Sequence, residues 1–102
     1  MTDNKTHNQM DEKIAARVLA RLVEHLRTRT DVQNIDLMNL SGFCRNCLSR
    51  WYKEESDQLG QTISADDSKK LIYGMDYDEW KKRYQSDASP EQLKKLKTTH
   101  QH

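Results

Sequence analysis

One proline and three glycines are the only strong helix breakers in this chain of 102 residues. They stand where runs of helical spacing start or stop: Gly42, Gly60, Gly74 and Pro90. Glycine often closes a helix, and proline is favoured at a first helical position. No segment shows the strict alternation of apolar and polar residues that is typical of a half-buried strand. We therefore predict an all-α fold, a small single-domain bundle of about five to six helices, two longer and the rest short.

The first long helix is predicted over Asp11 to Arg29, because apolar residues recur there at helical intervals. An apolar stripe is formed by residues four positions apart: Ile14, Val18, Leu22 and Leu26. Such a stripe normally faces a core. His25 falls between Ile14 and Val18 around this helix, so we expect its imidazole to face inward with the stripe.

A short helix and a second long helix are expected next. The short helix fits Val32 to Leu40, with Asp31 as its N-cap and Gly42 as its stop. The second long helix fits Phe43 to Leu59 with Ser41 as its N-cap. Under this assignment Cys44, the first residue of a Cys-Arg-Asn-Cys sequence, lies in the first turn of the second long helix.

The C-terminal part contains three helix-start signals in close succession. They are Ser64 with Asp67 ahead of residues 69–73, Asp76 with Glu79 ahead of residues 80–85, and Ser89 ahead of Pro90. Each predicts a short helix. Residues 1–10 and 98–102 are polar and aperiodic, so we predict disordered tails around a helical domain of residues 11–97.

Charge and composition exclude several classes of protein. The 17 basic and 16 acidic residues leave a net charge of +1, which gives no strong nucleic-acid signal. No apolar run approaches the ~20 residues of a membrane span, and residues 1–10 do not resemble a signal peptide. We therefore expect a cytoplasmic protein with reduced cysteines. Hydrophobic residues make up only 34% of the chain, which predicts a thin core and makes a homodimer plausible.

Cys44 and Cys47 form the one concentrated patch of chemistry. Residues three apart share a helix face, so both thiols can point the same way. They also lie within the apolar stripe of their own helix, which favours buried structural thiols. Two alternatives stay open. One is a redox pair with Cys44 as nucleophile and Cys47 as resolving thiol, and the other is a zinc site that adds His25 as a further ligand.

Polar side chains surround the two cysteines: Asn39, Arg45, Asn46 and Arg50. Arginine and a helix N-terminus both suit anions, so a small anionic ligand or an acidic segment of a partner protein could bind here. The alternative is that these side chains cap neighbouring helices. We find no Ser/His/Asp arrangement and no glycine-rich phosphate loop, and we assign no catalytic residue. The leading hypothesis is a non-enzymatic interaction module with its contact surface near the start of the third helix.

The run from Asn34 to Leu48, Asn-Ile-Asp-Leu-Met-Asn-Leu-Ser-Gly-Phe-Cys-Arg-Asn-Cys-Leu, resembles the signature of a family of short bacterial proteins. This family is catalogued as domain of unknown function 1244. Residues 73–81 and 88–92 are similar to its second half, and the resemblance extends over about residues 12–95. It implies a compact helical protein. It implies no activity and carries no catalytic residues over to this chain.

Overall fold

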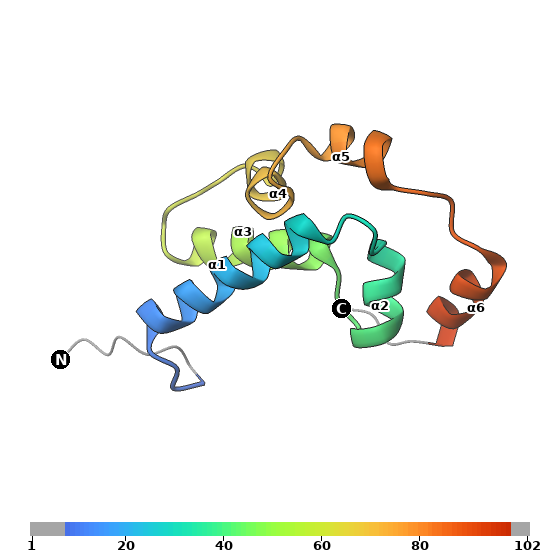
Figure 1. Cartoon of the computed structure of the whole chain (residues 1–102). Helices are drawn as coiled ribbons and strands as arrows, with labels where there is room; N and C mark the ends of the chain where they lie inside the picture. Colours follow the sequence, from blue (N-terminus) through green and yellow to red (C-terminus); the bar gives the residue numbers. More distant parts are fainter. Residues whose placement is uncertain (1–7, 99–102) are drawn as a thin grey trace.

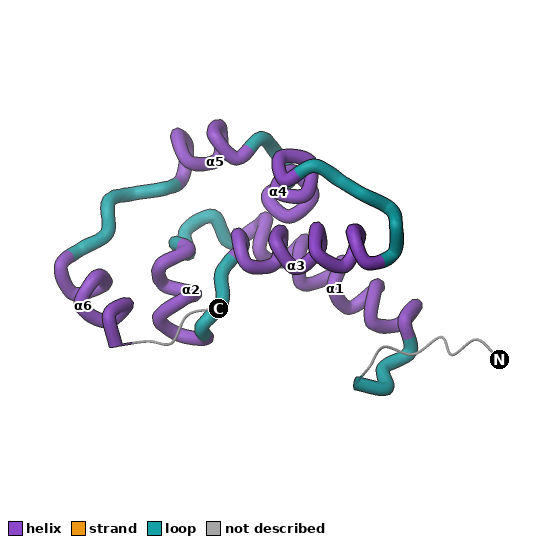
Figure 2. The backbone as a smooth tube through the Cα atoms, turned by 180° about the vertical axis from the view of Figure 1, so that it is seen from behind, coloured by secondary structure: helices purple, strands orange, loops and turns teal. Residues whose placement is uncertain are grey.

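The computed structural model describes residues 8–98, and within them the chain is all-α, with no β-strand. Figures 1 and 2 show the arrangement of the helices. Their bounds are α1 Glu12–Thr28, α2 Asn34–Ser41, α3 Arg45–Gln58, α4 Ala65–Tyr73, α5 Tyr77–Tyr84 and α6 Pro90–Thr98. None of these helices is long and apolar enough to span a bilayer. Of the predicted tails, residues 1–10 and 98–102, the parts at residues 1–7 and 99–102 lie outside the described residues, and Thr98 is the last residue of α6.

The first helix begins where the sequence predicts and the second does not. Asp11 is the N-cap of α1, and its side chain accepts hydrogen bonds from two backbone amides of the first turn. The predicted N-cap of α2, Asp31, is wrong, because its carboxylate pairs with Arg29 at 3.0 Å. Gln33 takes the N-cap position, and its backbone amide donates to Asp36 in the first turn. Gly42 closes α2 in the left-handed conformation, as predicted.

The predicted start of α3 is also wrong. Ser41 is still the last residue of α2, and its hydroxyl donates to the carbonyl oxygen of Leu37. Cys44 is the N-cap of α3 in extended conformation, so this thiol stands one residue before the first helical turn. The chain needs Gly42 and Phe43 to change direction between the two helices, which delays the start of α3 to Arg45.

The helix starts of the C-terminal part are confirmed. The Ser64 hydroxyl accepts from the amide of Asp67 at the start of α4, and the Ser89 hydroxyl accepts from the amide of Gln92 at the start of α6. Asp76 is the N-cap of α5. Serine hydroxyls therefore cap two of these three helices, whereas Asp76 occupies the N-cap position of α5 without a side-chain capping hydrogen bond.

The core lies where α1, α3, α4 and α5 meet. Its fully buried members are Leu26, Leu48, Ile72, Tyr73 and Trp80. Helix α4 packs across α3 and also touches α1 and α5, whereas α6 packs on α2 at the other end of the molecule. The core is thin, in agreement with the low hydrophobic content of the sequence.

Helix α1 joins this core only through its C-terminal half. Leu26 is buried, but the side chains of Ile14 and Val18 are 64% and 61% exposed. His25 is exposed as well, so the prediction that its imidazole faces inward is wrong. The apolar stripe is present as predicted, but α3 and α4 cover only one end of it.

Candidate functional site at the start of α3

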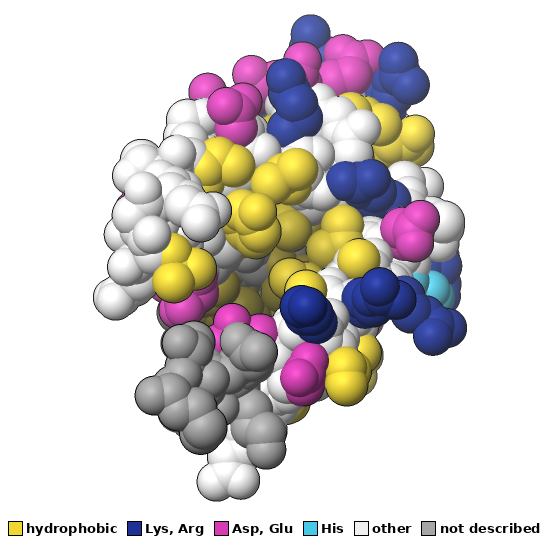
Figure 3. All heavy atoms as spheres, turned by 90° about the vertical axis from the view of Figure 1, so that its left-hand side faces the viewer, with side chains coloured by type: hydrophobic (Ala, Val, Ile, Leu, Met, Phe, Trp, Pro, Cys, Tyr) yellow, Lys and Arg dark blue, Asp and Glu magenta, His cyan; other side chains and the backbone are white. Residues whose placement is uncertain are grey.

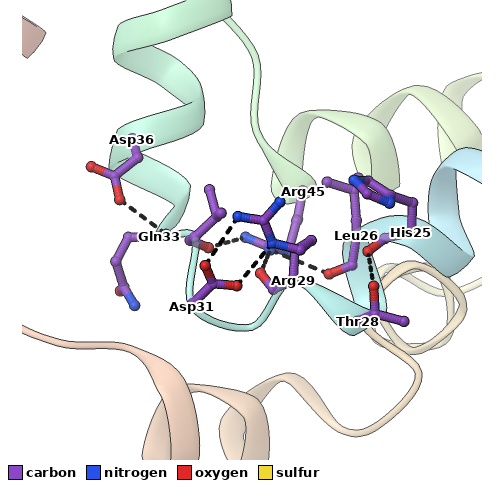
Figure 4. Close-up of polar contacts among 9 residues, drawn as sticks. His25, Leu26, Thr28, Arg29, Asp31, Gln33, Asp36 and Arg45 are labelled. Atoms are coloured by element: carbon purple, nitrogen blue, oxygen red, sulfur yellow. Dashed lines mark hydrogen bonds and ion pairs between the residues drawn. The ribbon is translucent and has the colours of Figure 1, made fainter.

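Arg45, the first residue of α3, is a buried cation that binds the end of α1. Its guanidinium donates to the carbonyl oxygens of Leu26 (3.3 Å), Arg29 (2.8 Å) and Val32 (2.8 Å). The last carbonyl groups of a helix have no intrahelical donor, and a positive charge suits the negative end of the helix. Figure 4 shows the guanidinium among these oxygens.

The burial of Arg45 limits which groups its side chain can contact. The residue is 1% exposed, and its guanidinium carbon lies 5.0 Å from the centre of the Trp80 ring. Burial lowers the pKa of Arg45, although arginine stays protonated in proteins. Arg45 therefore does not belong to an accessible contact surface, which corrects one of the predicted binding residues. The alternative interpretation, that this side chain caps a neighbouring helix, is confirmed for Arg45.

A chain of hydrogen bonds runs outward from Arg45. The guanidinium donates to Asn34 Oδ1 at 3.1 Å, and Asn34 Nδ2 donates to the Tyr73 hydroxyl at 3.0 Å. The Tyr73 hydroxyl donates to Asn46 Oδ1 at 2.7 Å, and Asn46 Nδ2 donates to the Tyr77 hydroxyl at 3.2 Å. Burial raises the pKa of Tyr73, so its hydroxyl keeps the proton that it donates. All four bonds point the same way, which strengthens each of them.

The last hydroxyl of this chain borders a pocket. Asn34, Asn46 and Tyr77 line one side of a pocket of about 280 Å³, and the loop of residues 85–88 between α5 and α6 lines the other. The Tyr77 hydroxyl accepts from Asn46, and its own hydrogen has no acceptor among the described residues. Of the predicted binding residues, Asn46 is therefore the one that borders this pocket.

The two thiols are buried inside the protein and do not line the pocket. Both cysteines are buried, with their sulfurs 3.9 Å apart, and Cys47 Sγ lies 4.0 Å from Met38 Sδ. Burial raises the pKa of the Cys44 thiol, and this outweighs the backbone amides of Cys47 and Asn46, which act to lower it. Cys44 is therefore a protonated, shielded thiol at neutral pH.

We expect neither thiol to react with iodoacetamide in the native protein below about pH 8, where an unperturbed thiol is also mostly protonated. The same reagent should label both cysteines rapidly in urea. Mass spectrometry of samples quenched across a pH series measures the labelling. Fast native labelling of Cys44 at neutral pH would show an open thiolate and would contradict the assignment of a shielded thiol.

A zinc site does not assemble from the predicted ligands. His25 points to solvent, away from the interior position that it would need to join the two thiols. Within residues 8–98 no three His, Cys, Asp or Glu side chains lie in a group that could hold a metal ion. The remaining histidines, at positions 7, 100 and 102, lie outside the described residues. The described donor set therefore does not fit structural zinc, which requires four ligands.

The structure does not bring the remaining predicted residues to the pocket. Asn39 binds α6, where its Nδ2 donates to the carbonyl oxygen of Gln92 at 3.1 Å, and its buried Oδ1 has no partner among the described protein atoms. Arg50 is exposed. Sequence reasoning missed Asn34, Tyr73 and Tyr77. The two tyrosines are spaced i,i+4, but the turn at Gly74 between them hides any helical pattern.

Comparison with known families places the site in context. A family model described as "Protein of unknown function (DUF1244)" matches residues 32–98, about two thirds of the chain. The chain belongs to this family. The match to DUF1244 contains every residue of the hydrogen-bonded chain from Arg45 to Tyr77, whereas α1 lies before it, although the sequence resemblance began at about residue 12. No curated protein matches the chain.

Proposed function

We propose that this DUF1244 protein is a non-enzymatic interaction module that binds an amide group of a partner protein in the pocket beside Asn46. One observation carries the proposal: the directed hydrogen-bond chain ends on the Tyr77 hydroxyl, which has a hydrogen to donate into the pocket. A polar group that borders a pocket and has no hydrogen-bond partner within the protein can bind a partner from outside the protein.

The chemistry of the lining favours an amide over an anion. Tyr77 supplies a donor for a carbonyl oxygen, and Asp87 on the facing loop supplies an acceptor for an N–H group. Asp87 is the one charged residue of the pocket lining, so a carboxylate ligand would meet its negative charge there. The ammonium groups of Lys69 and Lys81 lie over the Tyr77 ring, 4.5 and 4.6 Å from its centre, but do not line this pocket. Within the lining, the anionic ligand considered from sequence is therefore the less favourable occupant. A volume of about 280 Å³ suits one side chain, such as asparagine or glutamine, or one exposed peptide bond.

Arg45 contributes by positioning rather than by contact. Its guanidinium holds Asn34 Oδ1, which leaves Asn34 Nδ2 to donate to Tyr73. Tyr73 in turn holds Asn46 Oδ1, and this orients the amide nitrogen of Asn46 toward Tyr77. A donor that is held in place before binding loses less conformational entropy when a ligand arrives.

Acetamide tests the proposal as a minimal amide probe. In ¹H–¹⁵N spectra of the labelled protein, acetamide should shift the side-chain amide signals of Asn34 and Asn46 saturably, in the millimolar range or weaker because the ligand is so small. Acetate at the same concentration should shift them less. The substitution Tyr77→Phe removes the donor and should abolish the acetamide response.

Tyr52→Phe is the matched control, because Tyr52 is an exposed tyrosine on α3 outside the pocket. That variant should respond to acetamide as the wild type does. The proposal fails if acetamide produces no saturable shift at Asn34 and Asn46, or if the Tyr77→Phe variant responds unchanged.

A thiol redox role is the second candidate, and the 3.9 Å separation of the two sulfurs favours it. A disulfide needs about 2.05 Å between sulfurs, which rotation of the side chains could supply. The burial of both thiols and the raised pKa of Cys44 act against a redox role, so we rank that role below the interaction module. The interaction-module proposal includes a cytoplasmic location in a bacterial cell, supported by the two free cysteines and the family resemblance noted above.

A further inference from the structure

The exposed half of α1 carries an apolar stripe that nothing in residues 8–98 covers. Ile14 and Val18 are more than half exposed, and Leu19 and Leu22 are each 37% exposed. Figure 3 views the molecule from the side where this half of α1 lies and shows hydrophobic side chains gathered over a hollow. Exposed apolar patches on small proteins commonly mark an interaction surface.

The order of residues along this stripe suggests what covers it. Residues 11, 14, 18, 22 and 25 fall on one face of α1, and the intervals between them are three, four, four and three. This pattern reads the same in both directions about Val18. An antiparallel second copy of α1, related by a two-fold axis at Val18, would therefore place Ile14 against Leu22 of the second copy.

Charge at the ends of the stripe agrees with the same pairing. The two-fold axis at Val18 places Asp11 opposite His25 of the second copy, twice by symmetry. The imidazole can donate to the carboxylate in either of its protonation states. Asp11 uses Oδ1 to cap its own helix, so the second carboxylate oxygen can accept from His25, whose side chain is exposed.

A parallel pairing loses this complementarity. It would place each Asp11 against another Asp11, and like charges that face each other across an interface are unfavourable. Each His25 would then face another His25 in place of a carboxylate. Shifting the antiparallel axis by one residue, to Leu19, would place Ile14 against Glu24 and Arg17 against Arg21. With the axis at Val18, the residues of the stripe meet only apolar or oppositely charged groups of the second copy.

We infer that the protein forms a homodimer through antiparallel contact of the two α1 helices, with the two-fold axis at Val18. This inference does not rest on the proposed amide pocket, which lies among α2, α3 and α5. The dimer covers a stripe that the thin core of one protomer cannot cover, because α3 and α4 reach only the C-terminal half of α1.

Sedimentation equilibrium of the full chain tests the inference. The wild type should show a reversible monomer–dimer equilibrium. Val18→Glu places two carboxylates at the axis and should weaken dimerisation at least about a hundredfold, because facing like charges cost several kcal/mol. Leu40→Glu is the matched control, since Leu40 is an apolar residue on α2 that is 86% exposed, and that variant should dimerise as the wild type does.

Cysteine crosslinking tests the antiparallel order. A mixture of the Ile14→Cys and Leu22→Cys variants should form a disulfide-linked heterodimer on mild oxidation, and neither variant alone should link through its new cysteine. Peptide mass spectrometry separates the new cysteines from the buried native thiols. A protein that stays monomeric, a dimer unaffected by Val18→Glu, or an Ile14→Cys variant that links to itself would each overturn the inference.

Discussion

Replacing Arg45 by methionine should lower the free energy of unfolding by at least about 3 kcal/mol, because several buried or partly buried acceptors lose a charged donor at once. The acceptors include the carbonyl oxygens of Leu26 and Arg29 at the end of α1 and that of Val32. Each buried acceptor left without a donor costs about 1–3 kcal/mol. Methionine is unbranched and fills the space, so the loss reports the missing hydrogen bonds more than a cavity.

Urea denaturation followed by far-UV circular dichroism measures this loss. Arg50→Met is the matched control, because Arg50 is an exposed arginine on the same helix, and most exposed substitutions change stability by no more than about 0.5 kcal/mol. Arg45→Lys should fall between the wild type and Arg45→Met, since an ammonium group keeps the charge but cannot reproduce the planar fork of donors. Equal losses in the two methionine variants would show that the Arg45 hydrogen bonds do not stabilise the fold.

The contrast between Arg45 and Arg50 shows what the sequence could not reveal. Both are arginines near the two cysteines, and sequence reasoning placed both on a contact surface. The structure buries Arg45 because the N-cap of α3 is Cys44, three residues after the predicted N-cap Ser41, and the intervening turn directs the first side chain of α3 at the carbonyl groups of α1. That orientation depends on how two helices meet, and no local pattern encodes it.

Local sequence signals predicted a helix start correctly where the contact that stabilises the start is itself local. Ser64 and Ser89 begin helices as predicted because a hydroxyl that caps a free backbone amide stabilises the same structure in any fold. Asp31 failed as a cap because a closer competitor, Arg29, takes its carboxylate. The pocket could not be predicted, because Asn34, Asn46 and Tyr77 come from three helices and meet only through tertiary contacts.

The apolar stripe of α1 shows a different limit. Its period predicts a helix correctly, and Leu26 enters the core as expected. The same period cannot say which molecule covers Ile14 and Val18, because a stripe that faces the core of its own chain and one that faces a second copy follow the same spacing. Only the observed exposure distinguishes the two.

Replacing Trp80 by alanine should cost about 3–5 kcal/mol, the range for removing a large aromatic side chain from a core. Trp80 is 1% exposed, and its ring lies 5.0 Å from the Tyr73 ring and 5.7 Å from the Tyr84 ring. Trp80 and Tyr84 are spaced i,i+4, so their side chains lie on the same face of α5 and their rings are in contact. The substitution also removes the aromatic face beneath the Arg45 guanidinium.

Trp51→Ala is the control, because Trp51 is only half-buried and stacks on Phe43 at 6.0 Å. It should cost less than Trp80→Ala when both are measured by circular dichroism in urea. Trp80→Phe keeps an aromatic face and should recover part of the loss. A cost for Trp80→Ala no larger than that for Trp51→Ala would mean that α5 is not anchored through Trp80.

The anchoring of α5 matters for the site because Tyr77 and Trp80 belong to the same helix. The Tyr77 hydroxyl can meet Asn46 only while α5 stays on the core, and Trp80 is its one buried residue. In the folded fraction of the Trp80→Ala variant, the side-chain amide signal of Asn46 should therefore shift toward its position in Tyr77→Phe. An unchanged Asn46 signal would show that the pocket is held by the loop and α2 alone.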